Sequence, residues 1–176
     1  MGMTFTTLNV SGAERVVIET LLIDTDQIRD KNAPWLTVVP SHDTEDSNLQ
    51  RLEKIAKKLT KASDAAALLF FYFDDDMFSC TLYQNGKKSA SCDSRQESWA
   101  KLGKTLGERF GDDTIPKAFR FASKCSSVEE QIKLLEETVG TTFYELQEDK
   151  ARTVVRSDAT LRTIKAREAM LKKRPN

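Results

Sequence analysis

The sequence contains no long hydrophobic run. Its longest uninterrupted apolar stretch covers residues 65–73, whereas a helix that spans a membrane needs about 20 apolar residues. The first residues, MGMTFTTLNV, contain neither the basic segment nor the apolar segment of a secretory signal. We therefore expect no transmembrane helix, no membrane partner and no export of the chain.

Cysteine, histidine and glycine are also scarce. The three cysteines lack the spacing of a metal site, and in a chain without an export signal they indicate reduced thiols in a cytoplasm. The seven glycines are scattered, so no glycine-rich phosphate loop is present. The single histidine, His42, lies in the polar stretch SHDTED, and no nucleophile signature accompanies it. These absences favour a cytoplasmic protein that is not an enzyme and holds no cofactor.

Cys125 is the candidate for a reactive thiol. It follows Lys124 and lies just before a predicted helix that begins after Ser127. A positive neighbour and the N-terminal end of a helix both lower the pKa of a thiol. The sequence therefore predicts a lowered pKa for Cys125.

The net charge of the chain is zero, but its charges are unevenly distributed along the sequence. The chain has 27 basic and 27 acidic residues. Nine Lys or Arg and two Asp or Glu lie in residues 150–176, so this segment carries +7 and residues 1–149 carry −7. Such asymmetry is typical of a tail that contacts a partner. We expect a single domain over residues 1–149 and a basic amphipathic tail over residues 150–176.

The order of predicted elements indicates the α+β class. Strand-like residues occupy 4–10, 35–39 and 141–146, and residues 23–33 are predicted as a connection. Residues 66–73 are apolar on both faces, as in a covered central strand. Helices are predicted after capping-box serines. These serines are Ser11, Ser47, Ser94 and Ser127. We expect a mixed or antiparallel sheet that includes a three-strand meander, with helices packed on it and a helical C-terminal half.

The predicted helix after Ser47 is amphipathic. Its apolar stripe consists of Leu49, Leu52, Ile55, Ala56 and Leu59. Lys54, Lys57 and Lys58 lie outside this stripe, so we expect them at the surface.

Asn85-Gly86 predicts a two-residue hairpin turn, because both residues tolerate a positive φ. Counting from this turn pairs Cys80 with Ser91, Ser79 with Cys92, and Phe78 with Asp93. Cys80 and Cys92 are then expected on opposite faces of the sheet and should form no disulfide.

Three consecutive aspartates, residues 74–76, follow the apolar run. An apolar strand that ends in Asp-x-Asp resembles the metal-binding segment of nucleotide-sugar glycosyltransferases and the aspartate pair of receiver domains. Carboxylate oxygens suit Mg²⁺, so Asp74 and Asp76, with Asp93 nearby in the meander, form a candidate metal site. A turn is the favoured alternative, because aspartate side chains bond to nearby backbone amides.

Residues 70–94 also resemble bacterial proteins of unknown function. The resemblance is carried by YFDDDMF and by LYQNGK. It implies a bacterial cytoplasmic origin and transfers no activity and no site residue.

The basic tail contains the candidate partner-binding residues. Leu161, Ile164 and Leu171 form a narrow apolar stripe, which basic residues surround. These basic residues are Arg162, Lys165, Arg167 and Lys172. We predict a non-enzymatic domain that binds a protein partner or serves a regulatory role. The alternatives are a divalent-metal enzyme that uses Asp74 and Asp76, and nucleic-acid contact through the tail.

Overall fold

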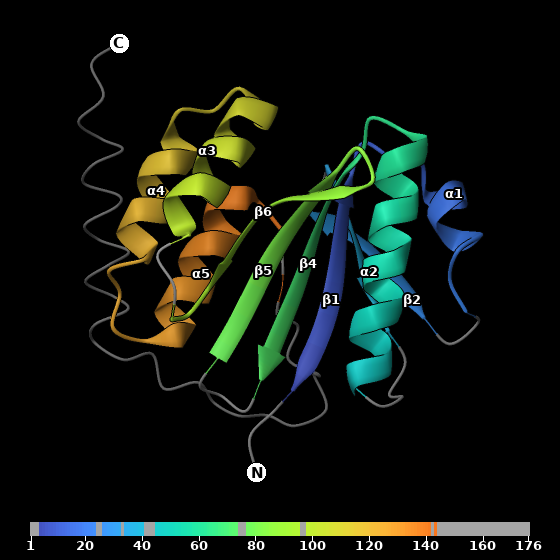
Figure 1. The fold of residues 1–176 in the computed structure, drawn as a ribbon, viewed down its shortest axis with the longest axis horizontal. Coiled ribbons are helices and arrows are strands. Elements are labelled where there is room, and N and C mark those ends of the chain that lie inside the picture. The colour runs from blue at the N-terminus through green and yellow to red at the C-terminus, as the bar shows by residue number, and fades with distance from the viewer. Residues whose placement is uncertain are drawn as a thin grey trace. The chain divides into compact units, whose positions relative to one another are not determined.

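The protein has a six-stranded antiparallel sheet with helices packed against it, seen in a computed structural model (Figure 1). The structure describes residues 4–23, 26–32, 34–40, 45–73, 77–95, 98–141 and 143. All of them belong to the compact unit formed by residues 1–144. The strands are β1 (Phe5–Ser11), β2 (Gln27–Asn32), β3 (Trp35–Val39), β4 (Ala66–Phe73), β5 (Met77–Gln84) and β6 (Lys87–Asp93). Their order in the sheet is β2-β3-β1-β4-β5-β6, which confirms the predicted α+β class and the β4–β5–β6 meander.

Helices cover both faces of the sheet, as Figure 1 shows. On one side lie the short α1 (Arg15–Glu19) and the long α2 (Glu45–Ala62). On the other side lie α3 (Trp99–Phe110), α4 (Thr114–Ala122) and α5 (Val128–Val139). Because a central strand then has no solvated face, β4 is apolar on both sides, as its sequence predicted.

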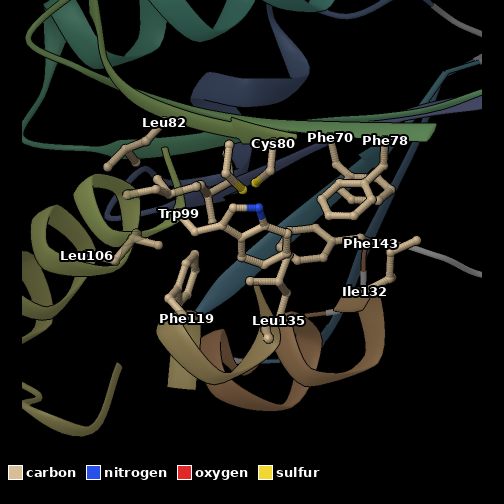
Figure 2. Close-up of a cluster of buried hydrophobic side chains, with 14 of the residues drawn as sticks. Phe70, Phe78, Cys80, Leu82, Trp99, Leu106, Phe119, Ile132, Leu135 and Phe143 are labelled. Carbon is tan, nitrogen blue, oxygen red and sulfur yellow. The ribbon is translucent and has the colours of Figure 1, made fainter. Parts of the chain in front are cut away.

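The core beneath α3, α4 and α5 is built around aromatic rings (Figure 2). Trp99 meets Phe78 edge to face, with ring centroids 5.6 Å apart, and its indole N–H donates to the Asp93 carbonyl at 2.8 Å. Phe70 stacks on Phe143 with centroids 4.8 Å apart. Complete burial of side chains of this size stabilises the fold by about 1.5–3 kcal/mol each.

The helices α3 and α4 approach each other closely at a glycine. A methyl group at Gly103 would lie 2.6 Å from Cβ of Phe119, closer than such atoms approach in real proteins. Gly103 is therefore retained within a helix, where glycine is otherwise unfavourable by about 0.8–1.0 kcal/mol relative to alanine.

The end of α5 and the residues after it form hydrogen bonds to β1 and β3. The Thr7 hydroxyl donates to the Phe143 carbonyl at 3.1 Å, and the Trp35 indole donates to the Val139 carbonyl at 3.1 Å. The side-chain oxygen Oδ1 of the buried Asn9 accepts from the hydroxyls of Thr37 and Thr141, at 2.7 and 2.8 Å. The compact unit is thus closed by bonds between its N-terminal and C-terminal parts.

The prediction of a connection over residues 23–33 was wrong, since Gln27–Asn32 forms β2, an edge strand paired with β3. The polar residues of β2 concealed it, because an edge strand with solvent access does not need an apolar run.

Only one of the four predicted capping boxes is confirmed. The Ser127 side chain accepts from the Glu130 amide at 3.1 Å and caps α5. Ser11 ends β1 instead, Ser47 lies within α2, and Ser94 extends the pairing of β6 by donating its amide to the Phe78 carbonyl. A serine can satisfy backbone groups in several ways, so its spacing alone does not define a helix start.

The predicted hairpin register was wrong beyond the turn. Asn85 has φ +52° and Gly86 φ +72°, and Gln84 pairs with Lys87 as expected. The register then shifts between Leu82 and Tyr83, so Ser79 pairs with Asp93. A β-bulge inserts one residue in β6, and a bulge leaves no clear mark in a sequence.

The same shift places Cys80 directly opposite Cys92, both buried on one face of the sheet. They were expected on opposite faces. Both are free thiols, so the predicted absence of a disulfide agrees with the structure although its reason was wrong.

Two further predictions, a short strand after α5 and a basic tail, fall partly or wholly outside the described residues. Of the short strand expected over residues 141–146, only Thr141 and Phe143 are described, and neither is in a strand. The tail over residues 150–176 lies outside them, so the domain boundary near residue 149 stays a prediction.

Candidate functional site

The outer surface of α2 carries a row of lysines. Lys54, Lys57, Lys58 and Lys61 recur at helical spacings of three and four, so they share one side of the helix. All four are exposed. The opposite side of the helix buries Leu52, Ile55, Ala56 and Leu59 against the sheet. The predicted exposure of Lys54, Lys57 and Lys58 is thus confirmed.

The β5–β6 hairpin adds two further lysines to this row. Its turn packs directly on α2, because the Gly86 amide donates to the Thr60 hydroxyl at 3.1 Å. A side chain at Gly86 would lie 2.9 Å from Cβ of Lys61, so glycine permits this close approach as well as the positive φ. Figure 1 shows the hairpin tip beside α2. The exposed Lys87 and Lys88 follow the turn immediately.

We call these six residues the lysine face. They are Lys54, Lys57, Lys58, Lys61, Lys87 and Lys88.

One carboxylate lies within the lysine face. Glu53 pairs with Lys57 at 2.7 Å. The hydrogen bond and charge of Lys57, the hydroxyl of Tyr83 and the charge of Lys88 hold the pKa of Glu53 below its ordinary value, although burial opposes them. Burial and Glu53 raise the pKa of Tyr83, and the Lys57 ammonium lies 6.0 Å from the centre of the Tyr83 ring. The influence of Lys88 on Glu53 shows that the hairpin and α2 share one electrostatic environment.

The other five lysines of the face form no ion pair with any residue that the structure describes. Two pairs, Lys54–Lys58 and Lys57–Lys61, place like charges at a spacing of four, which destabilises a helix by about 0.2–0.5 kcal/mol per pair. The face therefore concentrates positive charge at a small cost in stability.

The helices on the opposite side of the sheet differ in charge. The helix α5 contains four glutamates and one lysine. In contrast, α3 carries two lysines and one arginine against one glutamate, and α4 carries one lysine and one arginine. The acidic α5 lies on the opposite face of the sheet from α2 (Figure 1).

Of the candidate metal ligands, only Asp93 is described. Its carboxylate accepts from the Arg95 amide at 2.8 Å. Asp74 and Asp76 lie outside the described residues, so their metal site stays a prediction. Within the described ranges, no three His, Cys, Asp or Glu side chains come together to hold a metal ion.

The predicted lowering of the Cys125 pKa was wrong in direction. Burial and the nearby Glu130 raise the pKa of this thiol, and its Sγ donates weakly to the Phe121 carbonyl at 3.8 Å. The carboxylate of Glu130 opposes the effect that Lys124 was expected to have. Whether Cys125 reacts stays untested.

The remaining site residues predicted from the sequence lie outside the described residues. They are Arg162, Lys165, Arg167 and Lys172 of the tail. His42 also lies outside the described residues. Conversely, none of the six lysines of the lysine face was predicted from the sequence as a site residue: Lys54, Lys57 and Lys58 were expected only to be exposed. The spacing of Lys61 from Lys57 was a readable signal, but the docking of the hairpin on α2 left none.

No family model, curated protein or solved structure matches the chain. Among the helices of the described part, none has the length and apolar character needed to cross a bilayer.

Proposed function

We propose that this chain is a non-enzymatic interaction domain that holds an anionic macromolecule on the lysine face. The observation that carries the proposal is the docking of the β5–β6 hairpin on α2, which joins Lys87 and Lys88 to the helix lysines. A surface built from two separate elements raises the local concentration of anions, since five of its ammonium groups form no ion pair within the described ranges. The reduced state of three free cysteines supports a cytoplasmic setting for this role.

The proposal is tested with two variants of equal net charge. The face variant carries Lys58→Gln, Lys61→Gln, Lys87→Gln and Lys88→Gln. The control variant carries Lys104→Gln, Lys117→Gln, Lys124→Gln and Lys133→Gln, which lie on α3, on α4, in the connection between α4 and α5, and on α5. Both leave Lys57 and its pair with Glu53 intact.

Heparin is the probe, because it presents dense negative charge without specific chemistry. We expect the face variant to elute from a heparin column at lower salt than the wild type, whereas the control variant elutes with the wild type. Equal elution of the two variants would show that net charge alone governs binding, and the proposal would fail.

A further inference from the structure

We infer that the lysine face binds the phosphate backbone of a nucleic-acid duplex without reading its sequence; this rests on the proposed function and names its partner. Lys54 and Lys61 are seven residues apart on α2, about 10 Å along the helix axis. A duplex carries one charge for about every 1.7 Å of its axis. A line of ammonium groups therefore meets several phosphates at once.

Among the described residues, the lysine face has no large exposed hydrophobic side chain. Large exposed hydrophobic side chains occur elsewhere in the described part of the chain. They are Val16, Val17, Ile23, Phe73, Phe110 and Phe121. None belongs to α2 or to the β5–β6 hairpin, and Tyr83 is buried. Protein interfaces are built around apolar and aromatic anchors and are depleted in lysine. The composition of this face thus favours phosphates over an acidic protein.

The absence of exposed aromatic side chains on the described part of the lysine face also favours duplexes over single strands. Proteins that bind single strands combine basic grooves with aromatic side chains on which the bases stack. In the part of the chain that the structure describes, the lysine face offers ammonium groups and the Glu53 carboxylate but no exposed aromatic ring, and contacts to phosphates carry no sequence information. We therefore expect duplex to be preferred over single strand, with no dependence on sequence.

The test measures the binding of the full chain to a labelled duplex of about 20 base pairs, between about 50 and 200 mM salt. Each phosphate contact contributes about 0.9 to the slope of log K against log salt. The four lysines removed in the face variant should therefore make its slope shallower than that of the wild type by about 3.6. The control variant should keep the wild-type slope. Because both variants retain residues 150–176, the tail contributes equally to both.

Three further probes identify the partner, namely duplex RNA, single-stranded DNA and polyglutamate. Equal binding of duplex DNA and duplex RNA, with weaker binding of the single strand, supports recognition of the backbone. An unchanged slope in the face variant, or stronger binding of the single strand, overturns the inference. If polyglutamate binds through the lysine face and duplexes do not, the inference fails and the proposed function stands. If the face variant also elutes from heparin with the wild type, both fail.

Discussion

At the scale of single residues, the buried thiols are the groups most altered by the fold. Burial raises the pKa of Cys80 to about 12 from an ordinary value of 9.0. Burial, with Cys80 and Asp93 nearby, also raises the pKa of Cys92. Thiolate is the reactive form of cysteine, so both thiols should be inert in the folded protein although they face each other.

We predict that Cys80 makes the protein sensitive to alkali. Above pH 9 the unfolded chain loses the thiol proton, whereas the folded protein keeps it to about pH 12. Because the unfolded state then binds fewer protons, the free energy of unfolding falls as pH rises through this window, by at most about 1.4 kcal/mol per unit. Below pH 9 the contribution is constant.

Urea unfolding of the wild type and Cys80→Ala between pH 8 and pH 11 measures this effect. The difference in stability between the two should change with pH only above the ordinary thiol pKa of 9.0. Cys125→Ala is the matched control, since that thiol is far less buried and should give a smaller change. A difference that is constant over the whole range contradicts the prediction.

At the scale of elements, the decisive contact joins the hairpin to α2. The Thr60 hydroxyl donates to the Ala56 carbonyl at 2.9 Å and accepts from the Gly86 amide at 3.1 Å. Thr60 is buried, whereas Gly86 is half-buried. One hydroxyl thus positions Lys87 and Lys88 beside the helix lysines.

We predict that Thr60→Val destabilises the protein by about 0.5–1.5 kcal/mol, the net contribution of a typical hydrogen bond, because the Gly86 amide loses its acceptor. It should also weaken heparin binding, since the hairpin lysines lose their fixed position. The control is Thr105→Val. The Thr105 hydroxyl donates to the Lys101 carbonyl at 2.9 Å but lies on the exposed surface of α3, so its loss should change stability by less than about 0.5 kcal/mol. Equal effects of the two substitutions in thermal unfolding would contradict the proposed docking.

Local signals predicted those elements whose residues allow few alternatives. Asn85-Gly86 specified its turn through positive φ, and the apolar residues of β4 required cover on both faces. The bulge in β6 and the polar edge strand β2 were missed, because pairing with a neighbouring strand creates them and no local preference marks them.

The candidate site was predictable only in part for the same reason. Lys54, Lys57 and Lys58 follow from helical periodicity, which places them opposite the buried stripe. Lys87 and Lys88 lie more than 25 residues further along the chain, and only tertiary packing on Thr60 and Lys61 brings them to α2. Helical periodicity cannot predict a surface that is assembled from segments far apart in the sequence.

At the scale of the whole molecule, the described contacts end at Phe143. This ring is buried, stacks on Phe70, and its amide donates to the Glu136 carboxylate at 2.7 Å. Its carbonyl accepts from Thr7 of β1, so the last described residue closes the fold onto the first strand. Stability should therefore depend strongly on Phe143 and little on residues 150–176.

We predict that deleting residues 150–176 leaves the thermal unfolding temperature unchanged, whereas Phe143→Ala lowers the free energy of unfolding by about 3–5 kcal/mol. The control for ring size is Phe121→Ala, because Phe121 is 49% exposed and has little packing to lose.

The shortened chain also distinguishes the contributions of the two basic regions to heparin binding. It lacks residues 150–176, which carry +7, and it keeps the lysine face. It should keep its dependence on the face lysines in heparin binding. Unfolding or aggregation of the shortened chain would show instead that the tail belongs to the core, and equal effects of the two phenylalanine substitutions would contradict the closing role of Phe143.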